Sequence, residues 1–175
     1  MCAAGDELLV ARARDGSREA AGELFARHWP AAWRAALAIT GRPAMADDVA
    51  QDAFERAFAA LSRFDERRPF APWLHRIVVN RALDLVRAER RLVGLDHADD
   101  AVAAWDPSGG GDREMLAAIA GLSPERRACV ILRHGLGYRP HEIAEILGVP
   151  VGTVHSRLAR ALGDLRETEG AGRAH

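Results

Sequence analysis

The polar residues with the most informative spacing lie on two short helical patterns near the C-terminal end of the chain. The first pattern covers residues 140–147, and the second begins near residue 151. Gly148, between them, can adopt the positive φ of a tight turn, and the small side chain of Ala144 lets two helices cross closely. The spacing predicts a helix-turn-helix, whose second helix enters the major groove of DNA.

The second of these helices has one apolar face and one polar face. Its outward residues are His155, Ser156, Ala159 and Arg160. An arginine can bind guanine or a phosphate, a serine can bond to either, and an alanine can contact a thymine methyl group. The alternative is a small helical bundle whose surface happens to carry histidine and arginine. The apolar frame of the motif favours DNA binding; it consists of Ile143, Leu147, Val149, Val154 and Leu158.

A second candidate surface lies between residues 64 and 91, where arginines alternate with aromatic residues. The helix predicted there carries a polar stripe of Arg76, Asn80, Asp84, Arg87 and Arg91. The loop before this helix contains Phe64, Arg67, Arg68, Phe70 and Trp73. Because bases stack on aromatic rings while arginines follow the backbone, the pattern suits single-stranded nucleic acid. The same aromatic residues also suit a core that seals a helix junction, and the sequence leaves both interpretations open.

Helical periodicity dominates the elements that must position these residues, and strand signals are nearly absent. The apolar spacing predicts helices over 8–14, 21–41, 44–63, 73–91, 113–120, 124–135, 140–147 and 151–167. Pro30 lies inside the second of these helices, where it removes one backbone hydrogen bond and should kink or split the helix. The fold is therefore expected to be all-α.

Charge divides the chain into blocks, although 24 basic residues, all of them arginine, and 25 acids leave a net charge of −1. Residues 66–91 carry a net charge of +4 and residues 113–168 a net charge of +2, while residues 92–112 carry five acids and no base. The acidic block ends in a Pro-Ser-Gly-Gly-Gly run that is typical of a flexible linker. We therefore expect two small helical domains, over 1–91 and 113–168. The acidic linker over 92–112 joins them, and a disordered tail follows over 169–175.

Composition excludes several classes of protein. No apolar run approaches the roughly 20 residues that span a bilayer, and the first residues lack the pattern of a signal peptide. We therefore expect a cytoplasmic protein without membrane insertion. The two cysteines, Cys2 and Cys129, form neither a disulfide framework nor a metal cluster, so no cofactor and no metal site are expected.

An acidic helix face offers the one enzymatic alternative. Its carboxylates, Asp47, Asp48, Asp52 and Glu55, can in principle hold Mg²⁺ for nuclease chemistry. No neighbouring histidine or further carboxylate motif completes such a site. A solvated face or a protein-docking surface therefore fits better, and we expect no enzyme.

Taken together, these segments resemble the two domains of a bacterial sigma factor. Two segments resemble the promoter-melting domain: Ala46-Asp-Asp-Val-Ala-Gln-Asp-Ala-Phe54, and Trp73-Leu-His-Arg-Ile-Val-Val-Asn80 followed by Asp84 and Arg87. Five short segments resemble the domain that binds the −35 promoter element: Gly137-Tyr138, Glu142-Ile-Ala144, Leu147-Gly148, Gly152-Thr-Val154 and Ser156-Arg157. The short layout is similar to that of the extracytoplasmic-function (group IV) class.

The resemblance implies an initiation factor that binds core RNA polymerase, recognises the −35 and −10 elements and captures the melted −10 strand. The −35 readers that it implies are Arg133, His155, Ser156, Arg157, Ala159 and Arg160. For −10 binding and melting it implies Phe64, Arg67, Arg68, Phe70, Trp73, Arg76, Asn80 and Arg87. The face implied to dock on a coiled coil of the polymerase β′ subunit is Asp47, Asp48, Gln51, Asp52 and Glu55.

The further partners that the resemblance implies are the polymerase β flap, promoter DNA and an anti-sigma factor that masks both DNA-binding faces. A helix-turn-helix regulator that acts without being a polymerase subunit remains the alternative. His155 departs from the family pattern, because Lys or Arg is usual there. Arg139-Pro140 replaces a helix start that usually begins with serine, and Pro30 interrupts a helix that the family keeps longer.

Overall fold

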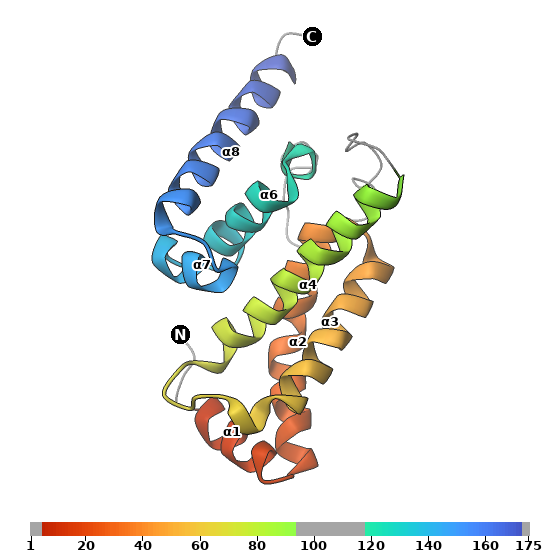
Figure 1. Ribbon diagram of the computed structural model, residues 1–175, viewed down its shortest axis with the longest axis vertical. Coiled ribbons are helices and arrows are strands. Elements are labelled where there is room, and N and C mark those ends of the chain that lie inside the picture. The colour runs from red at the N-terminus through yellow and green to blue at the C-terminus, as the bar shows by residue number, and fades with distance from the viewer. Residues whose placement is uncertain (1–4, 94–117, 173–175) are drawn as a thin grey trace.

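The computed structural model describes residues 5–93 and 118–172, and within those ranges every regular element is helical. The expected linker lies almost entirely outside the described residues, as do residues 1–4 and 173–175. Two helical domains result, one from each described range (Figure 1). The prediction of an all-α, two-domain fold is confirmed.

The first domain is built from a short helix and three long ones. These are α1 (Asp6–Arg14), α2 (Arg18–Thr40), α3 (Pro43–Ala59) and α4 (Phe70–Val93), with a 3₁₀ turn over Leu61–Arg63. Local signals fix the ends of α2. The Ser17 hydroxyl accepts a hydrogen bond from the Ala20 N–H at 3.2 Å, and Gly41 takes a left-handed φ of 71° at the other end.

Several helix boundaries differ from those expected in the first domain. Helix α2 continues through Pro30 without a break, so the expected split does not occur. The helix expected over 44–63 ends as an α-helix at Ala59 and finishes in the 3₁₀ turn. Helix α4 begins at Phe70, three residues early, because the proline at position 72 falls in its first turn, where no N–H is needed.

The second domain follows its sequence signals closely around the turn of the motif. Helix α7 spans Pro140–Leu147, as expected, and Gly148 ends it with a φ of 65°. Helix α8 (Val151–Gly172) runs beyond its expected end, so residues 169–172 of the expected disordered tail are helical. The helix expected over 124–135 is α6 (Pro124–Val130) followed by a π-helical turn over Ile131–Gly135.

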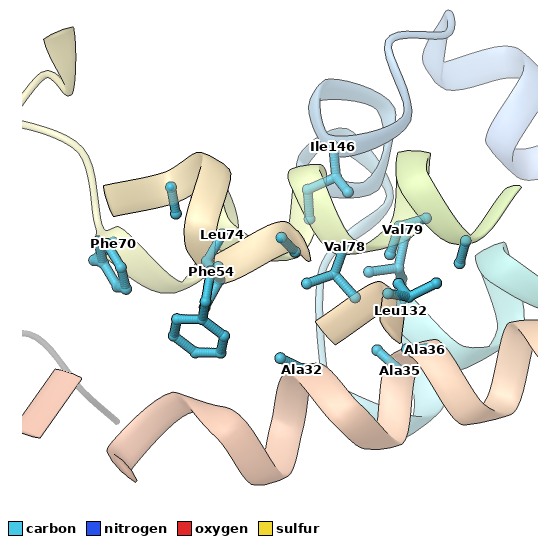
Figure 2. Close-up of a cluster of buried hydrophobic side chains, with 14 of the residues drawn as sticks. Ala32, Ala35, Ala36, Phe54, Phe70, Leu74, Val78, Val79, Leu132 and Ile146 are labelled. Carbon is cyan, nitrogen blue, oxygen red and sulfur yellow. The ribbon is translucent and has the colours of Figure 1, made fainter. Parts of the chain in front are cut away.

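The two domains pack against each other through a continuous buried core. Helix α4 packs against α2 and α3 of its own domain and also against α6 and α7 of the second domain. Figure 2 shows Leu132 of the second domain beside Val79 of α4 and Ala36 of α2. Ile146 of α7 lies on the other side of α4, near Val78. The main hydrophobic core is therefore formed by residues of both domains.

Pro30, inside α2, is expected to lower the stability of the folded chain. Pro30→Ala restores an N–H that can bond to the carbonyl four residues earlier and removes the clash of the ring, while the unfolded chain gains freedom. We expect the free energy of unfolding to rise by about 1 to 2 kcal/mol. The measurement is urea unfolding followed by far-UV circular dichroism.

Pro43→Ala is the matched control, because Pro43 occupies the first turn of α3, where proline is tolerated. This control should leave stability unchanged or slightly lower. A Pro30→Ala protein no more stable than the Pro43→Ala protein would show that α2 accommodates its proline without cost.

Candidate nucleic-acid interface

The outer face of α8 is exposed over its first two turns. His155, Ser156, Ala159 and Arg160 all face solvent. Val154 and Ala161, on the opposite side of the helix, are fully buried. The hydroxyl of Ser156 donates to the Thr153 carbonyl at 2.9 Å, so its oxygen remains able to accept a hydrogen bond. The helix therefore presents the polar face that the sequence predicts.

The start of α7 is held by a carboxylate in place of the missing serine cap. The Arg139 N–H donates to the Glu142 carboxylate at 2.7 Å, from one turn inside the helix. Because a helix N-terminus carries orphan N–H groups and a partial positive charge, this acid stabilises it. The departure at Arg139-Pro140 therefore leaves the geometry of the motif intact.

The two remaining −35 candidates differ in placement. Arg133 is exposed and donates to the Tyr138 carbonyl at 3.1 Å, beside the turn that leads into α7. Arg157 is half-buried and lies against Cys129 and Glu125, on the inward side of α8. Burial raises the pKa of the Cys129 thiol, although Arg157 acts against the shift. Arg157 is therefore not part of the exposed face.

The arginine candidates of the first domain lie along the loop and the outer side of α4. Arg67 and Arg76 are exposed, and Asn80 is half-buried. Arg68 meets the Glu145 carboxylate of α7 at 3.4 Å. Arg87 meets Glu125 at the start of α6 at 3.0 Å. Two of these arginines are thus paired with acids of the second domain.

The aromatic candidates are mostly core residues. Phe64 is 8% exposed and Phe70 only 2% exposed, so neither ring is free to stack on a base in this structure. Both rings belong to the core in this structure, and their expected role in −10 binding stays a prediction. Trp73 is half-buried, and its ring centroid lies 4.7 Å from that of Phe64. Trp73 is the one aromatic candidate of this loop and helix with an accessible surface.

The acidic face of α3 is partly neutralised inside the molecule. The Asp52 carboxylate lies 2.9 Å from Arg56 and 2.6 Å from Arg81 of α4, and the hydrogen bond from Arg56 is the main reason that its pKa is lowered. Asp47 accepts a hydrogen bond from the Trp33 indole at 2.6 Å. Gln51, Asp48 and Glu55 are exposed, and neither Asp48 nor Glu55 has an ion-pair partner among the described residues. Asp48 and Glu55 are therefore the freest carboxylates of this face.

Two buried histidines, His28 and His75, have polar partners that the sequence does not predict. The His28 ring lies 2.9 Å from the Asp6 carboxylate, which also holds Arg27 at 2.7 Å. The His75 ring meets the Tyr138 hydroxyl at 2.7 Å, across the domain boundary. A cavity of about 530 Å³ lies next to both histidines, between the loop before α4 and the segment before α7. Asp6 and His28 lie 22 positions apart in the sequence, and His75 and Tyr138 lie 63 apart, so residue spacing does not predict either pair.

The described residues contain no group of three or more histidine, cysteine or acidic side chains placed to hold a metal ion. Within the same residues no helix is long and apolar enough to cross a membrane.

Comparison with known families assigns both domains. Residues 24–92 match the model for sigma-70 region 2, and residues 112–165 match a model for sigma-70 region 4. The chain is 34% identical to the RNA polymerase sigma factor CnrH of Cupriavidus metallidurans, over 91% of this chain and 92% of that protein. It is 32% identical to the sigma factor CarQ of Myxococcus xanthus, over 91% and 94%.

Solved structures agree with these matches. The structure of CnrH in complex with the cytosolic domain of CnrY has a TM-score of 0.70 and 30% identity, covering 95% of this chain and 97% of that one. The sigma factor RpoE of Bartonella quintana, in complex with the anti-sigma factor NepR, has a TM-score of 0.73 and 25% identity. The latter match covers 85% of this chain and 96% of that one.

The buried His75 makes the domain contact sensitive to acid. Burial, followed by the nearby His28, lowers the pKa of His75 from 6.5 to about 4. The unfolded chain therefore binds a proton at this residue between pH 6.5 and pH 4 while the folded chain does not. We expect the free energy of unfolding to fall by about 3 kcal/mol on this account as pH drops through that window.

His75→Gln should flatten this part of the pH dependence, measured as urea unfolding midpoints across the window. His141→Gln is the matched control, because His141 is exposed on α7. If both variants lose the same amount of stability as the pH falls, His75 is not the cause of the acid sensitivity.

Proposed function

Because the chain belongs to the extracytoplasmic-function sigma factors of bacterial RNA polymerase, we propose a promoter-reading and a polymerase-docking role for particular residues of each domain. As a sigma factor it serves transcription initiation and binds DNA. The alternative of a regulator outside the polymerase is not favoured, because the first domain matches sigma-70 region 2 rather than a sensor domain. We place its action in the cytoplasm, with the polymerase. The domain bounds that we propose are 1–91 and 113–168, with 92–112 as the linker.

The second domain reads the −35 element with the outer face of α8. The exposed His155, Ser156 and Arg160 offer hydrogen bonds to base edges or phosphates, and Ala159 offers a methyl-sized apolar contact. Arg133, in the π-helical turn that follows α6, adds a contact to the DNA backbone. Arg157 faces inward and supports the helix from behind. The exposed, correctly spaced face of α8 is the observation that carries this assignment.

The first domain captures the melted −10 strand. Arg67, Arg68, Arg76 and Arg87 supply positive charge along one path, while Asn80 and Trp73 offer a polar and an aromatic contact. Unpairing and flipping a base costs a few kcal/mol, so a pocket that binds the extruded base is needed to offset it. Phe64 and Phe70 shape this region from the core by supporting Trp73.

The α3 face docks on the β′ coiled coil through its exposed members. Asp48, Gln51 and Glu55 are available for direct contact, while Asp52 is engaged with Arg56 and Arg81. The Asp52–Arg81 pair joins the docking helix to α4, the helix that carries the −10 residues. Asp52 therefore acts as a positioning residue between the two surfaces. The β flap is the proposed second polymerase contact.

An anti-sigma factor is the proposed regulator. The similar sigma factor RpoE was solved in complex with one, and CnrH in complex with the cytosolic domain of CnrY. We propose that such a partner covers the DNA-binding faces of this chain.

The test of the function is run-off transcription with purified core RNA polymerase and a promoter library. Addition of the chain should yield transcripts with defined 5′ ends that core polymerase alone does not make. Sequencing those ends would give the −10 and −35 elements. Absence of specific initiation on every promoter of the library would overturn the assignment.

Arg160→Ala should weaken initiation from −35-dependent promoters. Loss of one good base contact corresponds to about 1 to 3 kcal/mol of discrimination. Transcript yield at limiting chain concentration measures the effect. Arg166→Ala is the matched control, because Arg166 is an exposed arginine further along the same helix on a different face. Equal transcript yields from the two variants would remove Arg160 from the reading face.

Asp48→Arg should lower the affinity for core polymerase while leaving the fold intact, because Asp48 is exposed and makes no ion pair among the described residues. Binding is measured by fluorescence anisotropy of the labelled chain titrated with core enzyme. Glu7→Arg, an equal charge reversal on the exposed side of α1, serves as the control. If Asp48→Arg binds as tightly as Glu7→Arg does, the docking face lies elsewhere.

A further inference from the structure

The second domain lies on the arginine path of the first domain. Glu145 of α7 pairs with Arg68 at 3.4 Å, near the start of α4. Further along α4, Arg87 pairs with Glu125 at 3.0 Å. Both arginines belong to the proposed −10 face. In this structure they meet carboxylates where bound DNA would offer phosphates.

Next to the first ion pair, α7 narrows the space in front of Trp73, although Arg76 stays exposed. Trp73 and Arg76 line a cavity of about 210 Å³ whose opposite wall includes Glu142, Glu145 and Ile146 of α7. Trp73 is the accessible aromatic of the −10 face. A base stacked on its ring and the side chains of α7 would therefore compete for one narrow space.

Buried contacts hold the two domains in this position. The guanidinium of Arg127, whose residue is only 4% exposed, donates to the Ile39 carbonyl of α2 at 3.0 Å. His75 of α4 meets Tyr138 at 2.7 Å. Leu132 and Ile146 enter the core shared with α4 (Figure 2). The second domain is therefore held beside the −10 face by a packed interface and not only by surface ion pairs.

The −35 face is treated differently. His155, Ser156, Ala159 and Arg160 are exposed in the same structure, on the side of the second domain that does not face α4. The −35 face is open, whereas two arginines of the proposed −10 face are engaged by the second domain. The arrangement separates duplex binding, which needs only α8, from capture of a melted strand, which needs α4.

We infer that the free chain is self-inhibited: the second domain engages the −10 face through Glu125 and Glu145, and the contact of Tyr138 with His75 helps to hold it there until the two domains separate. This inference rests on the proposed −10 role of α4. Because the carboxylates and the DNA strand would contact the same arginines, the two states exclude each other. The apparent affinity for a single strand is then reduced by the fraction of molecules that are open.

The test compares an opened variant with the wild-type full-length chain. Tyr138→Ala with Glu145→Arg removes the partner of His75 and sets an arginine against Arg68, leaving the −10 face itself unchanged. Glu19→Arg carries the same change in charge on α2, at an exposed residue outside this interface. The probe is a fluorescein-labelled pool of random single strands of about 12 nucleotides, a length within the site sizes of single-strand binders.

We expect the opened variant to bind the pool roughly tenfold or more tightly than wild type, and Glu19→Arg to stay within about twofold of wild type. Small-angle scattering should show a larger radius of gyration for the opened variant alone. Equal affinity of the opened variant and wild type would overturn the inference. An equal gain in the opened variant and in Glu19→Arg would overturn it too, since charge alone would then explain the gain.

Two further measurements keep the result decisive. Should the double variant lose its helical circular dichroism signal, Glu145→Gln against Glu19→Gln replaces it, with the same direction expected and a smaller gain. Run-off transcription with core polymerase is carried out in parallel. Specific initiation by wild type without any gain in strand binding by the opened variant defeats self-inhibition and leaves the sigma function standing. Failure of wild type to initiate defeats the sigma function itself.

Discussion

The arrangement of the whole chain depends on one buried guanidinium. Arg127 reaches from α6 to the Ile39 carbonyl at the end of α2, and it also donates to the carbonyls of Ile119, Ala120 and Leu122. A buried charge is tolerated only when its hydrogen bonds are satisfied, so these carbonyls must hold their positions around it. The last turn of a helix carries partial negative charge, which favours a cation there. One side chain thereby fixes the start of the second domain to the end of α2.

Helix α4 is the element through which the first domain contacts most of the second domain and on which the proposed −10 residues lie. Its inner face packs on α2 and α3, and its remaining surface must serve both DNA and the second domain. The Asp52–Arg81 pair joins α4 to α3, the proposed docking helix. The ion pairs of Arg68 and Arg87 are largely exposed, and such pairs contribute at most about 1 kcal/mol each. They are therefore easily exchanged for phosphates, whereas the apolar contacts behind them resist separation.

Sequence predicted what local chemistry determines. Helix α7 matches its expected bounds because Pro140 and Gly148 act on neighbouring residues alone. The aromatic loop was left undecided because base stacking and core packing favour the same residue types, and only the tertiary contacts of Phe64 and Phe70 separate them. The sequence does not single out Arg127, since no neighbouring residue indicates that its partner is the Ile39 carbonyl, 88 positions away. Helical spacing predicts the exposed residues of α8, whereas Arg157 came only from the family resemblance and lies on the inward side, against Cys129.

Two of the acids that bring the net charge to −1 lie at this interface. A strongly basic −10 face left uncovered would bind any nucleic acid, because phosphate attraction is independent of sequence. Here Glu125 and Glu145 supply the opposing charge from within the chain, on the surface that packs against α4. Opposite charges placed on two domains can cancel only while the domains are together. The local charge balance at the proposed −10 face therefore depends on the packed arrangement of the domains, and their separation restores a positive field where a single strand would enter.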